Sequence, residues 1–571
     1  MSLLSSSHAG SALSGYSDPD SPSRNRRPVW QLNLLVGLWL AFPANIALWM
    51  QLSSLPDLQG LRGVAFAASL GLMVTCGLMT VFSLLSWRFI LKPAIVLLLV
   101  AAAGGAYFMT AYRVVIDPTM MVNVMQTDWR ETRDLLHPLF FVALVVLGLL
   151  PAWLAWRTPV VFHRFPAQAL RNFGGVVLSL LLLAAVALAA FQDLSSVMRN
   201  HKSLRYTINP FNSIYSIGRA VQGVGAERNR PILPVGEDAR LGASHRPGEK
   251  PPLLLLVVGE TARAANFSLN GYVRNTNPAL AAENVASFRQ VFSCGTSTAA
   301  SLPCMFSHLG RKDFESRDSE FQNLLDVLQR AGLAVLWIDN QSGCKGLCDR
   351  VPQVTPQELR LSARCDGDEC PDDVMVDEVG RRIAALPAAQ RAHGVVVVMH
   401  QMGSHGPAYY KRSPLDAKPF LPECQSSALQ QCERQSVVNA YDNTIATTDR
   451  FLAKAIRWLR SREADFAGSL LYVSDHGESL GENNLYLHGL PYAIAPDEQK
   501  HVPLIVWMSP AAQASSGVTM TCLKGRLDEP LSHDNLFHSV LGLMDVTTAL
   551  YQRPLDFFSA CVGADKATAV R

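Results

Sequence analysis

Cysteine is almost missing from the amino-terminal half of this 571-residue chain, where Cys76 is the one cysteine before residue 290. An excess of either charge is also missing, because 50 lysines and arginines balance 47 aspartates and glutamates. The sequence therefore has no basic footprint for nucleic acid. It also has no internal repeat that would indicate a solenoid. The informative features are the uneven distributions of apolar residues and of cysteines.

Charged side chains are scarce in five long apolar segments near the start of the chain. These segments are Trp30–Met50, Val64–Trp87, Ile90–Tyr112, Leu139–Trp156 and Phe173–Phe191. A helix needs about 20 apolar residues to cross the hydrocarbon core of a bilayer, and each segment is close to that length. We therefore predict a transmembrane domain of five helices over residues 29–193.

Basic residues are distributed unevenly over the loops between these segments. The richer side carries Arg24, Arg26, Arg27, Arg88, Lys92, Arg157, Arg164 and Arg171, and the other side carries Arg62, Arg113, Arg130 and Arg133. By the positive-inside rule the richer side is cytoplasmic. Five spans then place everything after about residue 192 on the outer side of the membrane.

Polar segments lie on either side of the predicted transmembrane domain. Residues 1–28 are rich in Ser, Gly and Pro, and the apolar segment after them is too long for a cleavable signal peptide. We expect a disordered cytoplasmic tail there. Residues 194–251 form a bridge, in which Leu204–Arg219 has the pattern of an interfacial amphipathic helix and Gly223–Pro252 is typical of a linker.

Residues 252–571 have a soluble composition in which strands alternate with helices. The strand-like runs are Leu253–Val258, Ala334–Ile338, Val395–Val398, Leu470–Val473 and Leu504–Trp507, and the helical patterns are Phe321–Ala331, Val374–Leu386, Val437–Arg460 and Asn535–Met544. This alternation predicts an α/β fold with a mostly parallel sheet covered by helices.

Ten cysteines follow residue 290, and eight of them form close pairs. The pairs are Cys294/Cys304, Cys344/Cys348, Cys365/Cys370 and Cys424/Cys432, and Cys522 and Cys561 are candidates for a fifth bridge. Structural zinc is the alternative, but the histidines that such sites often use lie elsewhere, near the strand ends. We therefore favour disulfides, which need an oxidising compartment and agree with the predicted outer location.

A hydroxyl-rich turn, Ser293–Cys304, contains our candidate nucleophile, Thr298. A hydroxyl is a poor nucleophile at neutral pH unless a base or a metal ion stabilises its alkoxide. Glu260, Asp475 and His476 each follow an apolar strand closely, where open α/β sheets build their sites. With the Thr298 oxygen they would make a four-ligand zinc site. Unrelated strand-end carboxylates and a capping threonine are the alternative, which the combination disfavours.

Three further histidines, His400, His405 and His488, follow or lie near the predicted strands. His405 and His488 stand in glycine-containing turns, which suit close approach to a phosphate. They would either bind a second metal ion or donate to phosphoryl oxygens and the leaving group. A structural, hydrogen-bonded role is the alternative for each.

The outer loop between the third and fourth apolar segments is polar. Asn123, Thr127 and Glu131 are spaced four apart, so on one helix they would form a single stripe. That stripe is either a solvated face or a surface beneath the soluble domain. Lys345, in a loop after a strand, is likewise either solvated or placed to attract phosphate.

Six motifs resemble those of the phosphoethanolamine transferases of Gram-negative inner membranes, in particular the lipid A-modifying branch with the mobile colistin-resistance enzymes. The motifs are Val258–Thr261, Ser293–Thr298, Pro303–Ser307, Asp339–Lys345, His400–Tyr410 and Ser474–Glu478. They stand in the family's order, and the resemblance covers nearly the whole chain. It implies an alkaline-phosphatase/sulfatase-like fold for the soluble domain.

The resemblance also implies roles for single residues. Thr298 would accept phosphoethanolamine covalently. One tightly bound zinc ion would be held by Glu260, Thr298, Asp475 and His476, while His405 and His488, with His400 as a further candidate, would bind a second zinc or substrate phosphate. The positions expected to bind the donor or to line the acceptor path are Asn123, Thr127, Glu131, Ser342 and Lys345.

The implied reaction transfers phosphoethanolamine from phosphatidylethanolamine to a phosphate of lipid A. We expect a monomeric, multi-pass inner-membrane enzyme with its catalytic domain in the periplasm and no nucleic-acid partner. An added amine should weaken the attraction of lipid A for cationic peptides, which predicts polymyxin resistance. The alternatives are transfer of phosphoethanolamine or glycerophosphate to core sugars or periplasmic glucans, a metal-dependent phosphohydrolase, and a lipid-binding sensor module without activity.

Overall fold

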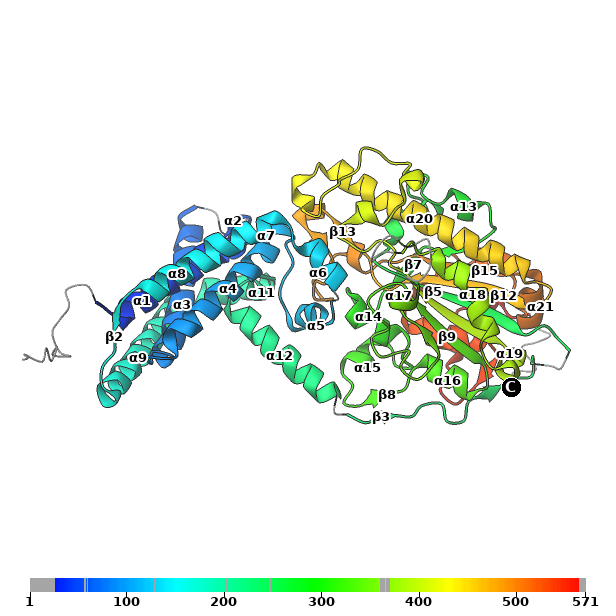
Figure 1. Ribbon diagram of the computed structural model, residues 1–571, viewed down its shortest axis with the longest axis horizontal. Coiled ribbons are helices and arrows are strands. Elements are labelled where there is room, and N and C mark those ends of the chain that lie inside the picture. Colours follow the sequence, from blue (N-terminus) through cyan, green and yellow to red (C-terminus); the bar gives the residue numbers. More distant parts are fainter. Residues whose placement is uncertain are drawn as a thin grey trace, which may run out of the picture.

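The computed structural model describes residues 26–563, except 56, 57, 59, 128, 202, 229, 246, 247, 360–364 and 366–369. A bundle of long helices forms one end of the molecule and an α/β domain the other, with α5 (Pro118–Gln126) and α6 (Trp129–Leu135) between them (Figure 1). Residues 1–25 of the expected tail lie outside the described residues. Arg27–Pro28, which we assigned to that tail, instead forms β1 and pairs with β2 (Val160–Val161). Backbone pairing holds this segment, which has few apolar side chains to bury.

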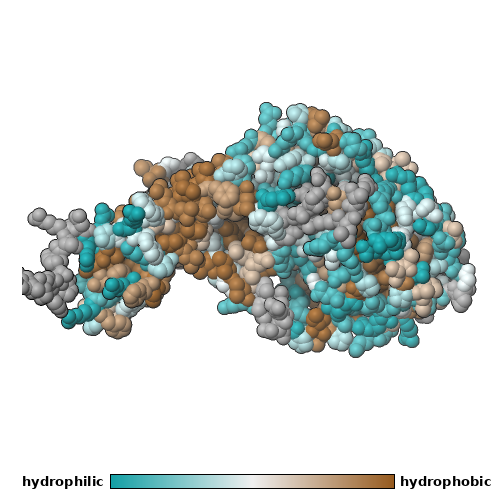
Figure 2. All heavy atoms as spheres, viewed as in Figure 1, coloured by the Kyte–Doolittle hydropathy of each residue, from teal (hydrophilic) through white to brown (hydrophobic). Residues whose placement is uncertain are grey.

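Among the residues that the structure describes, five helical segments are long and apolar enough to cross a membrane, as predicted. They are α1 to α2 (Val29–Ser53), α3 (Gly60–Leu84), α4 (Leu91–Ala111), α7 to α8 (Pro138–Arg157) and α9 (Phe165–Ala189). Hydrophobic residues cover much of the bundle surface, whereas the α/β domain is mostly hydrophilic outside (Figure 2). The chain is thus a membrane protein with a carboxy-terminal soluble domain.

The bridge after the last span is helical but interrupted. It consists of α10 (Phe191–Asn200), α11 (Ser203–Tyr206) and α12 (Phe211–Arg228), in place of the single helix predicted there. The break falls at Asn209–Pro210, where the proline has no N–H to continue a helix. The buried side-chain amide of Asn209 donates to the carbonyls of Ala44 at 3.1 Å and Ala102 at 2.7 Å. These bonds anchor the bridge in the helix bundle.

The described part of the linker lies on the soluble domain. Its strand β3 (Ile232–Leu233) pairs with β8 (Glu320–Phe321), and β4 (Arg240–Leu241) pairs with β17 (Val546–Thr547). The glycine and proline content of this segment predicted a linker but did not predict these strand pairings. Backbone pairing with a distant part of the chain, which composition does not reveal, holds it in place.

A seven-stranded sheet forms the centre of the soluble domain. Its order is β10 (Gln353–Val354), β9 (Ala334–Asp339), β11 (Val395–His400), β5 (Pro252–Gly259), β12 (Ala467–Ser474), β15 (Leu504–Met508) and β6 (Ala286–Phe288). The first five strands are parallel, and β15 runs antiparallel to both of its neighbours. The sheet is therefore mostly parallel, as predicted.

Helices cover both faces of this sheet, which explains why its strands are apolar without alternation. Alternate residues of β5, such as Leu254 and Leu256, face a core with α14 (Thr298–Met305), α16 (Leu324–Arg330) and α23 (Asp534–Leu543). Leu253 and Leu255 face the other core, with α18 (Val374–Ala384) and α20 (Arg434–Ser461). The carboxyl ends of the parallel strands remain free to carry polar side chains.

Five cysteine pairs form disulfides in the soluble domain. They are Cys294–Cys304, Cys344–Cys348, Cys365–Cys370, Cys424–Cys432 and Cys522–Cys561. These are the pairs that the spacing suggested, and the fifth bridge closes the longest loop. Cys76 is buried in α3 without a partner.

Asp134 of α6 joins the outer loop of the membrane domain to the soluble domain. Its carboxylate pairs with Lys411 and with Arg412, whose Nη2 lies 2.7 Å from Oδ2. The Asp134 and Arg412 side chains are 1% and 4% exposed, so water and salt screen this ion pair little. At the end of α4, the hydroxyl of Tyr112 donates to the Ser427 carbonyl at 3.1 Å. These contacts fix the outer loop against the soluble domain.

We expect Asp134→Asn to weaken this contact by about 3 kcal/mol, because it leaves two cations without their carboxylate. Hydrogen–deuterium exchange of the α6 amides in solubilised protein should then rise by on the order of 10²-fold. Asp193→Asn is the control, since its partner Arg62 is 68% exposed and such pairs contribute little. Equal exchange in wild type and Asp134→Asn would mean that the ion pair does not hold α6.

Candidate active site

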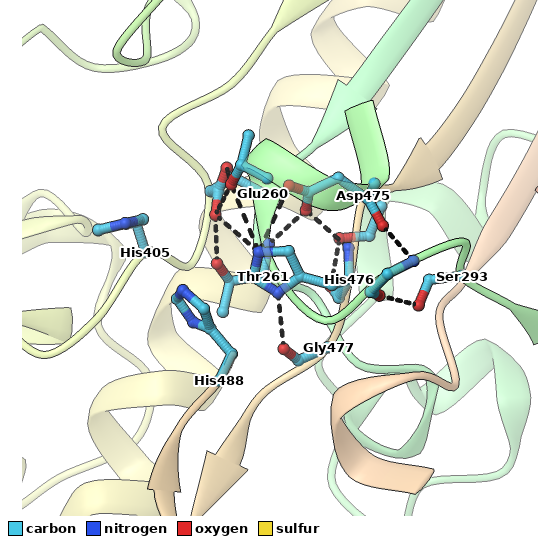
Figure 3. Close-up of polar contacts among 12 residues, drawn as sticks. Glu260, Thr261, Ser293, His405, Asp475, His476, Gly477 and His488 are labelled. Carbon is cyan, nitrogen blue, oxygen red and sulfur yellow. Dashed lines mark hydrogen bonds and ion pairs between the residues drawn. The ribbon is translucent and has the colours of Figure 1, made fainter. Parts of the chain in front are cut away.

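The candidate metal ligands meet at the carboxyl ends of two neighbouring parallel strands. Glu260 follows β5, and Asp475 and His476 follow β12, with Ser474 opposite Gly259 in the register. All three candidate side chains are buried. Nε2 of His476 lies 3.5 Å from Glu260 Oε1 and 3.4 Å from Asp475 Oδ2. The structure thus brings Glu260 together with the adjacent pair Asp475 and His476, which is far from it in the sequence (Figure 3).

Thr298 is the first residue of α14 and contacts this cluster. Its hydroxyl oxygen lies 3.0 and 3.2 Å from the two carboxylate oxygens of Glu260, and 3.4 Å from His476 Nε2. The Cys294–Cys304 disulfide ties the preceding turn to the helix. The amino terminus of a helix also favours negative charge such as that of a phosphoryl group. Thr298 is therefore a fixed hydroxyl in a setting that suits phosphoryl chemistry.

The imidazole of His476 is held in one orientation. Its Nδ1 lies 2.9 Å from the carbonyl of Gly477 and so carries the hydrogen that this bond requires. Nε2 is then the atom that faces Glu260 and Asp475. Metal-binding histidines usually have such a hydrogen bond at their other ring nitrogen.

The electrostatics of the cluster call for a positive charge between its carboxylates. Burial disfavours the charged form of His476, but the carboxylates of Asp475 and Glu260 outweigh it and raise the pKa of His476 to about 10. Burial and the charge of Glu260 raise the pKa of Asp475 to about 6. Burial also opposes ionisation of Glu260, but the hydrogen bond and charge of His476 lower the pKa of Glu260. Either a proton on Nε2 or a metal cation supplies the charge.

The residues present fit a metal ion. Oδ1 of Asp475 accepts hydrogen bonds from the backbone of Thr261 at 3.1 Å and of His476 at 2.7 Å, whereas Oδ2 has no hydrogen-bond partner in the described part of the chain. A buried carboxylate oxygen without a donor costs free energy, which a bound cation would offset. One ligand atom each of Glu260, Asp475 and His476 lie within 4.8 Å of one another. Oxygen and imidazole donors at this spacing suit zinc.

The backbone next to Glu260 is strained. Thr261 has a φ of 60°, in the left-handed region that β-branched residues rarely adopt. Its hydroxyl donates to Glu260 Oε1 at 2.6 Å, and its carbonyl accepts from the Tyr441 hydroxyl at 2.8 Å. Such strain persists where the surroundings hold a residue in place, which is frequent at functional sites.

A small cavity of about 10 Å³, room for roughly one water molecule, lies beside Thr298. It is lined by Asn123, Gln126, Thr127, Glu131, Thr298, Gln341, Ser342, Lys345, His405 and His488. All five positions that the resemblance assigned to donor or acceptor binding are in this lining. The outer loop of the membrane domain therefore forms part of the site wall.

On one helix, Asn123, Thr127 and Glu131 would have formed a single stripe. The structure instead places them on different elements. α5 ends at Gln126, Thr127 is extended, and Glu131 lies on α6. The Thr127 hydroxyl donates to the Asn123 carbonyl at 2.8 Å and so completes the end of α5. Glu131 contacts the soluble domain, where Gln341 donates to its Oε1 at 3.1 Å.

Cationic and imidazole groups of the soluble domain complete the cavity wall. His405 Nε2 lies 3.8 Å from Glu131 Oε1. Lys345 Nζ lies 3.0 Å from the Ser342 hydroxyl oxygen and 3.4 Å from the carbonyl of Gln126. Groups from both domains therefore contact each other across the cavity.

His488 is held by a buried acid. Its Nδ1 lies 3.2 Å from Oε1 of Glu478, and the Tyr409 hydroxyl donates to Oε2 at 2.9 Å. Burial raises the pKa of Glu478 to about 8. Burial and the nearby charges of His476 and His405 keep the pKa of His488 well below its usual range, so its imidazole is neutral at pH 7. Figure 3 shows His405 and His488 on the same side of the cluster.

His400, the third histidine singled out from the sequence, does not line the cavity. It is buried at the end of β11, with Nδ1 3.2 Å from Asp339 Oδ2. Burial would lower the pKa of His400, but the Asp339 carboxylate outweighs it and raises that pKa. The structure thus places His400 at the end of β11, outside the lining of the cavity.

Sequence reasoning missed three functional candidates: Gln126, Gln341 and Glu478. The first two line the cavity and the third orients His488. Gln341 and Glu478 lie inside two of the motifs, and Gln126 precedes Thr127 directly. A search of each motif for polar side chains without a role would have found Gln341 and Glu478.

Comparisons with known proteins show which family the chain resembles over nearly its whole length. The chain matches the family model Sulfatase over residues 252–546 and the model Phosphoethanolamine transferase EptA/EptB over residues 74–223. It is 39% identical to phosphoethanolamine transferase EptA of Salmonella typhimurium, over 92% of this chain and 96% of that protein. It is 38% identical to phosphatidylethanolamine transferase Mcr-1 of Escherichia coli, over 90% of this chain and 94% of that protein.

A solved structure gives the same result for the fold. The integral membrane protein lipooligosaccharide phosphoethanolamine transferase A (EptA) from Neisseria meningitidis superposes with a TM-score of 0.89 at 34% identity. The match covers 94% of this chain and 99% of that one, so it includes both domains. The soluble domain has the sulfatase/alkaline-phosphatase-like fold. The chain therefore belongs to the phosphoethanolamine transferase family that includes EptA and Mcr-1.

Proposed function

We propose that this enzyme transfers phosphoethanolamine from phosphatidylethanolamine to a phosphate of lipid A, through a covalent intermediate on Thr298. The observation that carries the proposal is the position of the Thr298 hydroxyl. It touches Glu260 and His476, and it borders a cavity whose wall comes partly from the membrane domain. A nucleophile at that place can meet a lipid headgroup without the lipid leaving the bilayer.

The zinc site consists of Glu260, Asp475, His476 and the Thr298 oxygen. A bound zinc ion lowers the pKa of a coordinated hydroxyl and offsets the charge that develops at phosphorus. Glu260 accepts a hydrogen bond from Thr298 and so directs the hydroxyl oxygen. Oδ2 of Asp475, which accepts no hydrogen bond from the described residues, supports this assignment.

The transfer consists of two displacements at phosphorus. In the first, the Thr298 hydroxyl loses its proton and its oxygen forms a bond to phosphorus, while the bond from phosphorus to the diacylglycerol oxygen breaks and that oxygen takes up a proton. In the second, a phosphate oxygen of lipid A attacks the same phosphorus, the bond to Thr298 breaks, and the threonine oxygen regains its proton. His405 and His488 are our candidates to supply the proton, to bind phosphoryl oxygens or to hold a second zinc ion.

The donor headgroup is recognised by the cavity lining. Glu131 is the acidic residue of the lining, and a carboxylate suits the ammonium group of ethanolamine. Lys345, with Ser342 beside it, suits the phosphate. Asn123 and Thr127 come from the membrane side, where the donor lipid lies. We place this site at the periplasmic face of a Gram-negative inner membrane, because the disulfides and the basic loops agree with that orientation.

The acceptor is tested by mass spectrometry of lipid A from Gram-negative cells whose own lipid A carries no phosphoethanolamine. Expression of this chain should add the mass of one phosphoethanolamine, and Thr298→Ala should add none. The modified cells should also tolerate polymyxin better, because the added amine lowers the net negative charge of lipid A. Unmodified lipid A in cells with folded, zinc-loaded protein would overturn the acceptor assignment in favour of core sugars, periplasmic glucans or water.

A metal-dependent phosphohydrolase is the second candidate, because the same zinc and threonine arrangement also serves hydrolysis. Purified enzyme with phosphatidylethanolamine as its one substrate separates the two. A phosphohydrolase would release free phosphoethanolamine at every turnover. A transferase should release one diacylglycerol per enzyme quickly and then slow down until lipid A is added.

A further inference from the structure

His533 is a buried residue that no part of the proposed chemistry uses. It precedes α23 and follows β16 (Pro530–Ser532), which pairs in parallel with β7 (Gln290–Phe292). Its side chain is 2% exposed. It is not a metal ligand candidate in the described cluster. Its contacts nevertheless reach both segments that build the active site.

Each nitrogen of the His533 ring contacts a different backbone segment. Nδ1 lies 3.0 Å from the backbone nitrogen of Cys294, which opens the turn that leads to Thr298. Nε2 lies 2.9 Å from the carbonyl of Ser474, the residue before Asp475. The ring is therefore a direct bridge between the nucleophile turn and the strand end that carries two metal ligands.

The two contacts require one particular form of the ring. A backbone N–H donates to Nδ1, so Nδ1 must be unprotonated, and a carbonyl accepts from Nε2, so Nε2 must carry the hydrogen. Burial lowers the pKa of His533 to about 4, which keeps the ring neutral at pH 7. The backbone N–H of His533 also donates to the Phe292 carbonyl at 3.0 Å, which fixes the residue at its own main chain.

We propose that His533 is a positioning residue that sets the distance between the Thr298 oxygen and the Asp475–His476 pair. This inference rests on the proposed role of Thr298 as nucleophile. Besides the contacts of the Thr298 hydroxyl with Glu260 and His476, the His533 ring joins the backbones of the two segments directly. A misplacement of about 1 Å at reacting atoms can lower a rate by about 10²-fold, so loss of the bridge should lower the rate of chemistry more than substrate binding.

Three substitutions separate the two contacts. Asn at position 533 retains an acceptor near the place of Nδ1, Gln retains a donor near the place of Nε2, and Leu removes both. We expect kcat to fall by about 10-fold in His533→Asn and His533→Gln and by about 10²-fold in His533→Leu. KM for phosphatidylethanolamine and the zinc content of the purified full-length protein should change by less than about threefold. The rate at which Thr298 gains phosphoethanolamine, followed by intact-protein mass spectrometry, should fall with kcat.

His538→Leu is the matched control, because His538 is a buried histidine of α23, the helix that begins directly after His533. Its Nδ1 accepts a hydrogen bond from the backbone of Gln552 at 3.2 Å, a contact away from both site segments. It should lower the melting temperature about as much as His533→Leu while leaving kcat unchanged. Should His533→Leu not fold, the Asn and Gln variants still carry the test.

Two results would overturn the inference: kcat within about threefold of wild type in all folded His533 variants, or an equal fall of kcat in His538→Leu. The proposed function fails on a different measurement. If Thr298→Ala still transfers phosphoethanolamine, Thr298 is not the nucleophile, whatever the His533 variants do.

Discussion

Thr298→Ala should lower the release of diacylglycerol from phosphatidylethanolamine by at least about 10⁴-fold, since the substitution removes the atom that attacks phosphorus. No other hydroxyl in the cavity lining is placed to replace it, because the Ser342 hydroxyl already donates to Gln341 Oε1 at 2.5 Å and that of Thr127 donates within α5. The measurement is release of labelled diacylglycerol by purified protein. Intact-protein mass spectrometry should show one added phosphoethanolamine in wild type and none in the variant.

Thr298→Ser is the control for this experiment. It keeps the hydroxyl and removes only a methyl group, so it should keep measurable transfer and still gain the added mass. Addition of phosphoethanolamine to Thr298→Ala protein would place the covalent intermediate on another residue. Transfer without any covalent addition to wild type would favour direct attack by the acceptor.

Asp475→Asn should greatly reduce zinc-dependent stabilisation without unfolding the protein. The amide oxygen can take the place of Oδ1 and accept from the Thr261 and His476 amides, while an amide nitrogen at the place of Oδ2 cannot bind a cation. The substitution also removes one of two buried carboxylates that repel each other. Without metal, the variant should therefore melt at or above the temperature of metal-free wild type.

Zinc titration with thermal melting measures this difference. At a zinc concentration of 1,000 Kd, wild type should gain about 4 kcal/mol, and a variant that binds 100-fold more weakly should gain about 1.4 kcal/mol. Elemental analysis of the purified proteins should show the same loss of zinc, and transfer activity should fall with it. A zinc response equal to that of wild type would exclude Asp475 as a ligand.

Asp442→Asn serves as a matched control. Asp442 is also buried, and it accepts hydrogen bonds from Asn266 at 2.6 Å and Tyr272 at 2.9 Å on a different part of the domain. Its loss should lower the melting temperature with and without zinc by the same amount. The difference between the two aspartates then isolates metal binding from general stability.

The sequence predicted best those features that depend on local pattern. The five apolar segments needed only length and hydropathy, and they recur in the structure with shifts of a few residues, up to eight at the start of the last segment. The meeting of Glu260 with Asp475 and His476 was predictable because each follows an apolar strand of a parallel sheet. Strand ends of such a sheet share an edge, even though the pairing of β5 with β12 is not visible in the sequence.

Features that depend on distant contacts were not predictable. The extended backbone at Thr127 breaks a helical pattern, and its result is the bond between Glu131 and Gln341, two residues 210 positions apart. The anchoring of the bridge through the Asn209 amide likewise depends on distant carbonyl partners in the bundle. His533 shows no sequence signal for its role, since its two contacts are backbone groups, whose place depends on the whole fold.

The small cavity beside Thr298 bears on the competition between transfer to the acceptor and hydrolysis by water. The covalent intermediate that we propose on Thr298 would be useful only if it were not first hydrolysed by water. With α5 and α6 held against the soluble domain, the wall leaves room for roughly one water molecule. A phosphoethanolamine group on Thr298 is larger than that space, so it would displace the water there, and the loop of the membrane domain would limit the access of further water to the proposed intermediate. The membrane domain would thereby limit hydrolysis of the intermediate, in addition to anchoring the protein in the bilayer.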